Sequence, residues 1–165
     1  MASSKQSGFA YLWTLMLVAF LGAGLSIAAS VYTTAAQREK ERQLIFIGHE
    51  FRNALQSYYL AGGSHNQYPL TLEELLKDPR FPGVKRHLRR LYVDPTTGKA
   101  EWTLVRMQGR IVGIRPMSQQ KPIKQDNFYD DDVGLARKAH YSDWVFTYPF
   151  DLFVPPADGK QLGQS

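Results

Sequence analysis

The chain has 165 residues, a formal net charge of +5 and no cysteine. The absence of cysteine excludes a disulfide framework and thiolate chemistry, although it does not fix the redox compartment. The modest positive charge does not by itself indicate a nucleic-acid partner.

The most informative segment is the stretch from Gln6 to Gln37, which contains no charged residue. A helix rises ~1.5 Å per residue and a hydrocarbon core is ~30 Å thick, so about 20 apolar residues span it. We therefore predict a transmembrane helix over residues 9–37. The alternative is a cleaved secretory signal peptide, in which the small residues from Ser26 to Ser30 would supply the cleavage site.

The apolar pattern continues beyond this stretch at three- and four-residue intervals, which is typical of an amphipathic helix. It is carried by Leu44, Ile47, Phe51, Leu55 and Tyr58. The first proline is Pro69, so nothing before it interrupts a helix. We predict one continuous helix from about Phe9 to Ala61, ended by Gly62-Gly63. Its amphipathic part, residues 38–61, is expected to pack on a domain formed by residues 62–154.

That domain is predicted to hold a short helix and three strands. Thr71 and Glu74 have the spacing of a capping box at the start of the short helix. Residues 102–107 and 110–115 are rich in β-forming side chains and are separated by a two-residue, glycine-containing link, which predicts a hairpin. Residues 142–148 predict a third strand. The fold class is therefore α+β, with a long N-terminal helix packed on a small antiparallel sheet. Residues 155–165 are expected to form a flexible tail.

The sequence carries no pattern of catalytic or metal-binding residues. The four histidines are dispersed, and His49-Glu50 lacks the second histidine of a zinc-protease helix. The acidic run of residues 130–132 lacks the spacing and glycine of a calcium loop, so we interpret it as a solvated loop rather than an ion site. We expect no enzyme activity, no metal and no cofactor.

One basic cluster gives a candidate binding site. Residues 80–90 include six basic or histidine side chains and no acid. Clustered cations bind phosphates by releasing counterions, so Lys85, Arg86, Arg89 and Arg90 form a possible patch for an anionic ligand. Base-stacking aromatic residues do not alternate with these cations, and we favour a solvated loop with no nucleic-acid partner.

Gly8-Phe9 before a long apolar helix resembles the prepilin cleavage site of type IV pilins and of the pseudopilins of type II secretion systems. The turn from Asp94 to Lys99, with the strand pair after it, is similar to the β-region of bacterial pseudopilin-like proteins, as are residues 122–124 and 141–146. The resemblance implies a pilin-like fold whose leader, residues 1–8, is removed by a prepilin peptidase before Phe9 is methylated.

The same resemblance implies a location and a function. The protein would be a single-pass protein of the bacterial inner membrane with its C-terminal domain in the periplasm. It would serve protein transport as a structural subunit, assembling through its N-terminal helix with other pseudopilins or pilins.

The chain departs from that family at Trp13, where the usual residue is a glutamate thought to contact the terminal amine of a neighbouring subunit. A lone carboxylate in hydrocarbon is costly, so its loss implies a minor or atypical subunit. Alternatively, Trp13 and Tyr11 anchor the helix at the membrane interface. Gly22 and Gly24 either allow a neighbouring helix to approach or reflect the general frequency of small residues in membrane helices.

Two further functions stay open. One is a pilin-like surface protein that binds DNA or another anionic ligand through the basic patch. The other is an exported protein with an ordinary signal peptide.

Overall fold

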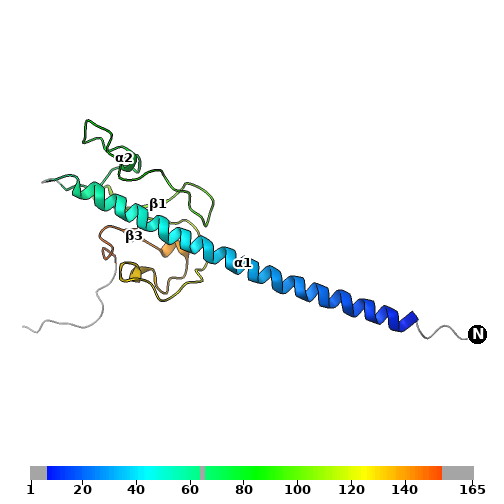
Figure 1. Cartoon of the computed structure of the whole chain (residues 1–165). Coiled ribbons are helices and arrows are strands. Elements are labelled where there is room, and N and C mark those ends of the chain that lie inside the picture. The colour runs from blue at the N-terminus through cyan, green and yellow to red at the C-terminus, as the bar shows by residue number, and fades with distance from the viewer. Residues whose placement is uncertain (1–6, 64–65, 154–165) are drawn as a thin grey trace, which may run out of the picture. The chain divides into compact units, whose positions relative to one another are not determined.

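The computed structural model describes residues 7–63 and 66–153, without the side chains of residues 7, 8 and 24–30. The predicted leader therefore lies mostly outside the described residues, and the predicted tail, residues 155–165, lies wholly outside them. The chain divides into two compact units, residues 1–39 and 40–165, which are described separately. Its elements in chain order are α1 (Ser7–Leu60), α2 (Glu73–Leu76), β1 (Thr103–Met107), β2 (Arg110–Arg115), η1 (Asp130–Leu135), η2 (Tyr141–Asp143) and β3 (Phe146–Thr147) (Figure 1).

Helix α1 is a single α-helix of 54 residues, and its continuity confirms the predicted uninterrupted helix. It ends within one residue of the predicted position. The amide of Ala61 still donates to the carbonyl of Ser57 at 3.0 Å, and Gly63 then turns the chain with a φ of 59°. Only glycine adopts this left-handed conformation without a steric cost, so Gly63 ends the helix.

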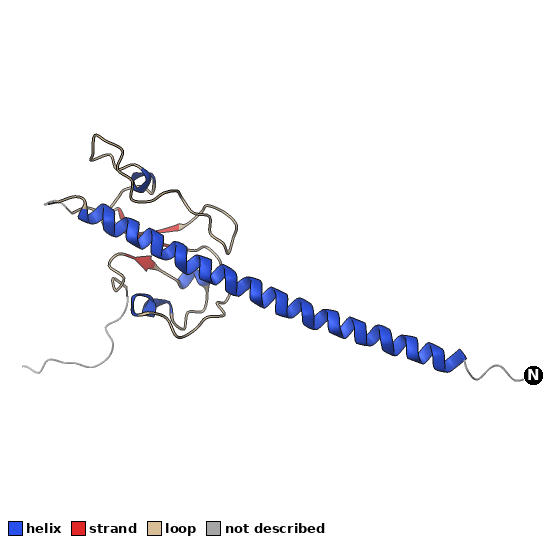
Figure 2. Ribbon diagram, viewed as in Figure 1, coloured by secondary structure: helices blue, strands red, loops and turns tan. Residues whose placement is uncertain are grey.

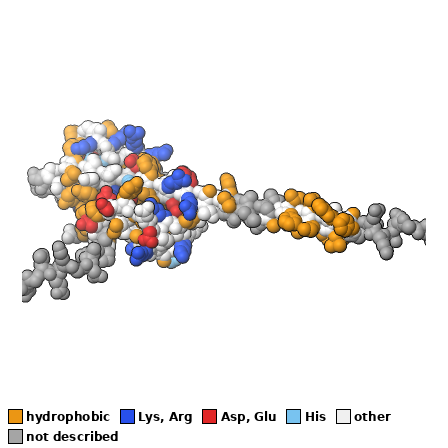
Figure 3. Space-filling view, turned by 60° about the horizontal axis from the view of Figure 1, so that its bottom comes forward, with side chains coloured by type: hydrophobic (Ala, Val, Ile, Leu, Met, Phe, Trp, Pro, Cys, Tyr) orange, Lys and Arg blue, Asp and Glu red, His pale blue; other side chains and the backbone are white. Residues whose placement is uncertain are grey.

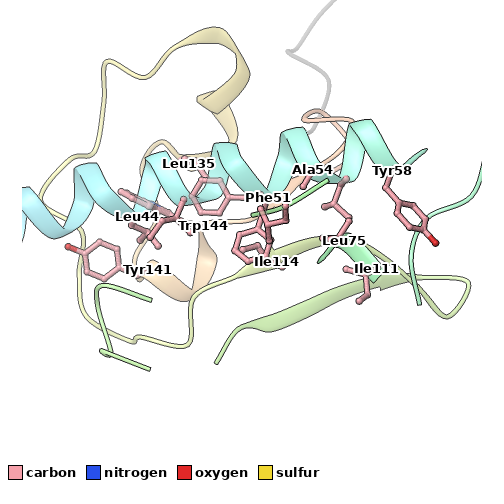
Figure 4. Close-up of a cluster of buried hydrophobic side chains, with 14 residues drawn as sticks. Leu44, Phe51, Ala54, Tyr58, Leu75, Ile111, Ile114, Leu135, Tyr141 and Trp144 are labelled. Atoms are coloured by element: carbon pink, nitrogen blue, oxygen red, sulfur yellow. The ribbon is translucent and has the colours of Figure 1, made fainter. Parts of the chain in front are cut away.

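The second unit is built around residues 40–60 of α1. All five apolar residues of the predicted stripe are buried, and Leu44, Phe51 and Leu55 are 0% exposed, which confirms the amphipathic reading. Figure 4 shows this stretch of α1 with side chains of the core beside it, including Ile111 and Ile114 of β2. The other buried apolar residues of this core are Ala54, Leu75, Leu88, Ile111, Ile114, Leu135, Tyr141, Trp144 and Phe146.

The sheet is antiparallel with the strand order β1-β2-β3, which confirms the α+β class (Figure 2). Gln108 and Gly109 join the first two strands with φ values of 51° and 79°. Two consecutive positive φ values are the signature of a type I′ turn, so the predicted hairpin and its link are confirmed. The register shifts between Val105 and Arg106, which pair with Gly113 and Ile111, so β2 carries one extra residue, Val112, at this point.

The third strand is much shorter than predicted, because the chain before it pairs elsewhere. Residues 141–143 form the 3₁₀ helix η2. The amide of Tyr141 donates to the carbonyl of Gln120 at 3.0 Å, and that of Ser142 donates to the carbonyl of Ser118 at 2.9 Å. These amides are therefore not available to β2, and β3 is limited to Phe146–Thr147.

The capping box predicted at Thr71 is wrong. Helix α2 begins after Leu72, and no side chain caps it. The Glu74 carboxylate instead accepts a hydrogen bond from the Tyr58 hydroxyl at 2.6 Å and one from the Leu70 amide at 3.2 Å. The Glu74 carboxylate, which the predicted capping box would have used, is thus engaged in a tertiary contact with α1.

Two glycines make room for β3 against α1 and β2. A Cβ on Gly48 would lie 2.2 Å from the Phe146 ring, and a Cβ on Gly113 would lie 2.5 Å from the Phe146 carbonyl. Phe146 is 0% exposed. The packing of this strand therefore depends on the absence of a side chain at both positions.

Candidate functional site

The first candidate site is the surface of α1 in the first unit, from Phe9 to Ala23. Large apolar side chains that would normally be buried are exposed here, as the space-filling view shows (Figure 3). Their exposed fractions run from 50% to 69%, and they are Phe9, Tyr11, Leu12, Trp13, Leu15, Met16, Leu17, Val18, Phe20 and Leu21. A contiguous apolar surface of this kind marks a place where another apolar body binds.

Polar groups on this surface are few, and one of them is satisfied within the helix. The Thr14 hydroxyl donates to the carbonyl of Tyr11 at 2.8 Å. A Cβ placed on Gly22 would meet nothing within 4 Å, so this position offers a smooth surface to a neighbour. The surroundings of Gly24, the second predicted contact, lie outside the described side chains.

The predicted processing bond, Gly8–Phe9, lies in α1, whose first described residue is Ser7. The Phe9 side chain is 69% exposed. The described residues of α1 therefore do not cover the Phe9 side of this bond.

Among the described residues, no helix combines the length and the hydropathy of a membrane span.

The second candidate site, the basic patch, is only partly assembled. Arg86 and Arg89 line one hollow together with Leu76, Lys77 and Val84. Lys85 and Arg90 instead lie over aromatic rings, with the Lys85 ammonium 4.0 Å from the centre of Phe81 and the Arg90 guanidinium 5.2 Å from the centre of Tyr92. The four cations thus do not converge on one point.

Two other members of the basic segment serve the fold. Arg80 and His87 surround Asp78, which is fully buried. The Arg80 Nη2 atom is 2.6 Å from Asp78 Oδ2, and Arg80 Nε is 2.9 Å from Oδ1. The Arg80 guanidinium also lies 3.7 Å from the centre of the Tyr58 ring on α1. Hydrogen bonds from Arg80 hold the pKa of Asp78 well below its usual range, against the opposing effect of burial.

His87 extends this cluster to a serine on α1. Its Nδ1 atom is 2.7 Å from the Ser57 hydroxyl, and its Nε2 atom is 3.1 Å from Asp78 Oδ2. The residue types are those of a hydrolase triad, but the charge of this aspartate is already neutralised by Arg80. Ser57 also lies inside α1, where backbone amides are used by the helix and cannot form an oxyanion hole. The cluster therefore fixes the 78–87 loop to α1.

A second ionic cluster corrects the interpretation of the acidic run as a solvated loop at Asp132 alone, since Asp130 and Asp131 are exposed. Asp132 is only 2% exposed and lies in η1. Its Oδ1 atom is 3.0 Å from Arg52 Nη1, and its Oδ2 atom is 2.7 Å from His49 Nε2. Arg52 also donates from Nε to the carbonyl of Thr147 at 3.2 Å, which links α1, η1 and β3. No local pattern predicts this cluster, because Asp132 is about 80 positions away from His49 and Arg52.

A buried glutamate near the start of the second unit was also missed. Glu41 is 4% exposed although it sits in a run of charged residues. Its carboxylate accepts hydrogen bonds from the amides of Ile123 and Lys124 and from the Tyr141 hydroxyl, the last at 2.9 Å. Glu41 therefore fixes two loops of the domain to α1. Across the described residues, no three His, Cys, Asp or Glu side chains are grouped so that they would hold a metal ion.

Comparison of the chain with protein-family models, with curated proteins and with solved structures finds no match.

Proposed function

We propose that this protein is a pseudopilin-like structural subunit, which assembles with other pilin-class subunits through the apolar part of α1. The observation that carries the proposal is the contrast along one helix. Between Phe9 and Leu21 the large apolar side chains are at least 50% exposed, whereas Leu44, Phe51 and Leu55 are fully buried by the domain. The domain thus uses one part of the helix and leaves the other for a partner outside this chain.

The continuity of α1 favours this proposal over an exported protein with a cleaved signal peptide. The backbone is helical from Ser7 to Leu60, and this range includes the small residues 26–30 that a signal peptidase would cut. A cut there would remove the exposed apolar surface and leave the domain helix intact. A cut at Gly8–Phe9 would keep that surface on the mature protein.

The basic patch gives less support to the alternative of a DNA-binding or anion-binding protein. Two of its cations rest on aromatic rings, and Arg80 and His87 are occupied by Asp78. The function we propose is therefore assembly without catalysis. Trp13, in place of the glutamate usual in the resembling family, points to a minor or atypical subunit.

The test is the N-terminus of the protein made in a host with a prepilin peptidase. We expect intact-mass and N-terminal analysis to find Phe9 as the first residue, with a methylated amine. Gly8→Ala should retain the leader, and Gly22→Ala should serve as a matched control with normal processing. A first residue between Ala29 and Tyr32 would support ordinary secretion and reject the proposal. Identical masses for the wild type and Gly8→Ala would mean that residue 8 is removed from both, and would reject the requirement for Gly8 at the cleavage site.

A further inference from the structure

We propose that Tyr11 and Trp13 at one end, and Tyr32 at the other, hold α1 at a fixed depth in a phospholipid bilayer. The hydrocarbon midplane would then lie at Gly22-Ala23. This inference rests on the proposed function, because it takes the apolar part of α1 to be embedded in lipid.

The spacing of the three aromatic residues carries the inference. Tyr11, Trp13 and Tyr32 are 68%, 61% and 76% exposed, and tryptophan and tyrosine favour the boundary between hydrocarbon and headgroups. Trp13 and Tyr32 are 19 residues apart. At ~1.5 Å per residue this separation is about 29 Å. A hydrocarbon core is ~30 Å thick, so one ring would reach each boundary.

The part of α1 between the anchors is suited to the hydrocarbon core of the bilayer. The sequence from Trp13 to Tyr32 contains no charged residue. Its described large side chains are exposed and apolar, such as Met16, Phe20 and Leu21 at 60%, 68% and 61%. The Thr14 hydroxyl is bonded to the Tyr11 carbonyl, so it brings no unsatisfied donor into lipid.

The same depth of α1 in the bilayer places two functional positions outside the hydrocarbon. The Gly8–Phe9 bond lies about 7 Å beyond Trp13 along the helix axis. Headgroup layers add roughly 5–8 Å on each side of the core, so this bond would lie among the headgroups. Arg38, the first charged residue after the apolar run, lies about 9 Å beyond Tyr32, at the level of water. Trp13 would thus have a positioning role at the interface.

The chain is well suited to a depth measurement because it has no cysteine. The test attaches a nitroxide to single cysteines in the full-length protein, reconstituted in phosphatidylethanolamine–phosphatidylglycerol vesicles. Collision rates with oxygen and with a water-soluble nickel chelate then give the depth of each label. The labelled positions leave all three anchors in place and are Leu15, Ala19, Ala23, Ile27, Val31 and Ala35.

We expect the depth to be greatest within one turn of Ala23, to fall towards Leu15 and Val31, and to reach water by Ala35. A maximum more than one turn from Ala23 would overturn the proposed depth of α1 in the bilayer and leave the proposed function standing. No depth gradient at any position would reject the membrane helix, and with it the proposed function.

Moving the aromatic residues at one end of the span tests whether they determine the depth of α1 in the bilayer. In a variant with Tyr11→Leu, Trp13→Leu and Leu17→Trp, the aromatic boundary moves one turn along the helix. The depth maximum should then shift by about two residues towards Tyr32, which is half the displacement. Phe20→Leu, a change at an equally exposed aromatic residue between the anchors, should leave the maximum in place. An unchanged maximum in the anchor variant would overturn the proposal.

Discussion

The two parts of α1 belong to the same helix, yet their apolar side chains have opposite surroundings. From Phe9 to Leu21 they are at least 50% exposed, while Leu44, Phe51 and Leu55 are 0% exposed. The charged residues differ as well: the first part has none, and in the second part Glu41 and Arg52 are buried with partners. The comparison teaches that the domain buries only its own part of the helix, and that in the proposed function the exposed first part is the surface that meets a partner.

The largest expected effect tests how strongly the domain holds its part of α1. Phe51 is fully buried, and its ring packs edge-on to Trp102 with ring centres 5.5 Å apart. We expect Phe51→Ala to lower the free energy of unfolding by about 3–5 kcal/mol, because it leaves a cavity. Urea unfolding of the full chain in detergent, followed by tryptophan fluorescence, measures the loss.

The matched control lies five positions earlier on the same helix. Phe46 is 59% exposed, so Phe46→Ala should change the same free energy by less than about 0.5 kcal/mol. Equal losses for the two variants would show that burial does not distinguish the faces of α1 in this unit.

The Asp78 cluster, in which Arg80 and His87 contact the buried carboxylate, tests how the domain is stabilised around its part of α1. Removing one partner of a buried ion pair leaves the other charge uncompensated, so Asp78→Ala should cost about 3 kcal/mol. Asp126 is the control, because both side chains of its ion pair with Arg137 are more than two-thirds exposed. Asp126→Ala should cost less than about 1 kcal/mol. The same urea titration compares them, and a loss at Asp126 as large as that at Asp78 would contradict the structural role of the cluster.

A charge on the exposed part of α1 should affect membrane association and leave the domain stable. Leu21→Arg should weaken membrane insertion by about 3 kcal/mol, the cost of a cation near the centre of a spanning helix. Extraction of membranes with alkaline carbonate measures the retained fraction. Gln37→Arg, at the end of the uncharged run, should remain in the membrane fraction. Full retention of Leu21→Arg would argue against burial of this surface in lipid.

Two glycines of α1 provide a smaller contrast between its parts. Gly48→Ala would place a Cβ 2.2 Å from the Phe146 ring, so it should lower domain stability by about 1–3 kcal/mol even though alanine favours helix. Gly22→Ala meets nothing within 4 Å and should leave domain stability unchanged. Thermal unfolding by circular dichroism compares them. A stable Gly48→Ala variant would mean that β3 can shift to accept the methyl group.

Acid should weaken the domain through Asp78, whose pKa in the folded protein lies below that of the unfolded chain because Arg80 bonds to the carboxylate. A group of this kind contributes stability that is fully present above its unfolded pKa of about 4. The contribution falls as the pH drops from there towards the folded pKa. Stability of the wild type should therefore decline below about pH 4 more steeply than that of Asp78→Asn, measured by urea titration. Parallel pH curves would exclude this linkage.

The sequence predicted the features that depend on local periodicity. The buried stripe of α1 follows from apolar residues at helical spacing, and the hairpin follows from Gln108-Gly109 between two β-rich runs. The end of α1 follows from Gly62-Gly63. In each case the residues that determine the structure are neighbours in the chain.

The predictions that failed involve residues brought together from distant parts of the chain. Asp132 is buried because His49 and Arg52, on α1, provide its hydrogen bonds. The third strand is short because Tyr141 and Ser142 pair with residues 118–120. Glu74 leaves the predicted capping box because Tyr58 donates to it. Local sequence patterns do not report such tertiary partners.

The most direct test of the central claim is intermolecular cross-linking in membranes from cells that make the full chain and its pilin-class partners. Single cysteines are placed at each position from Tyr11 to Ala23, with a control at Gln56 on the exposed side of the domain part of α1. If the apolar surface packs on other helices, disulfide-linked products should recur every three to four positions, and Gln56 should give none. Absence of cross-linked products throughout residues 11–23, or an equal yield at Gln56, would contradict assembly through this helix.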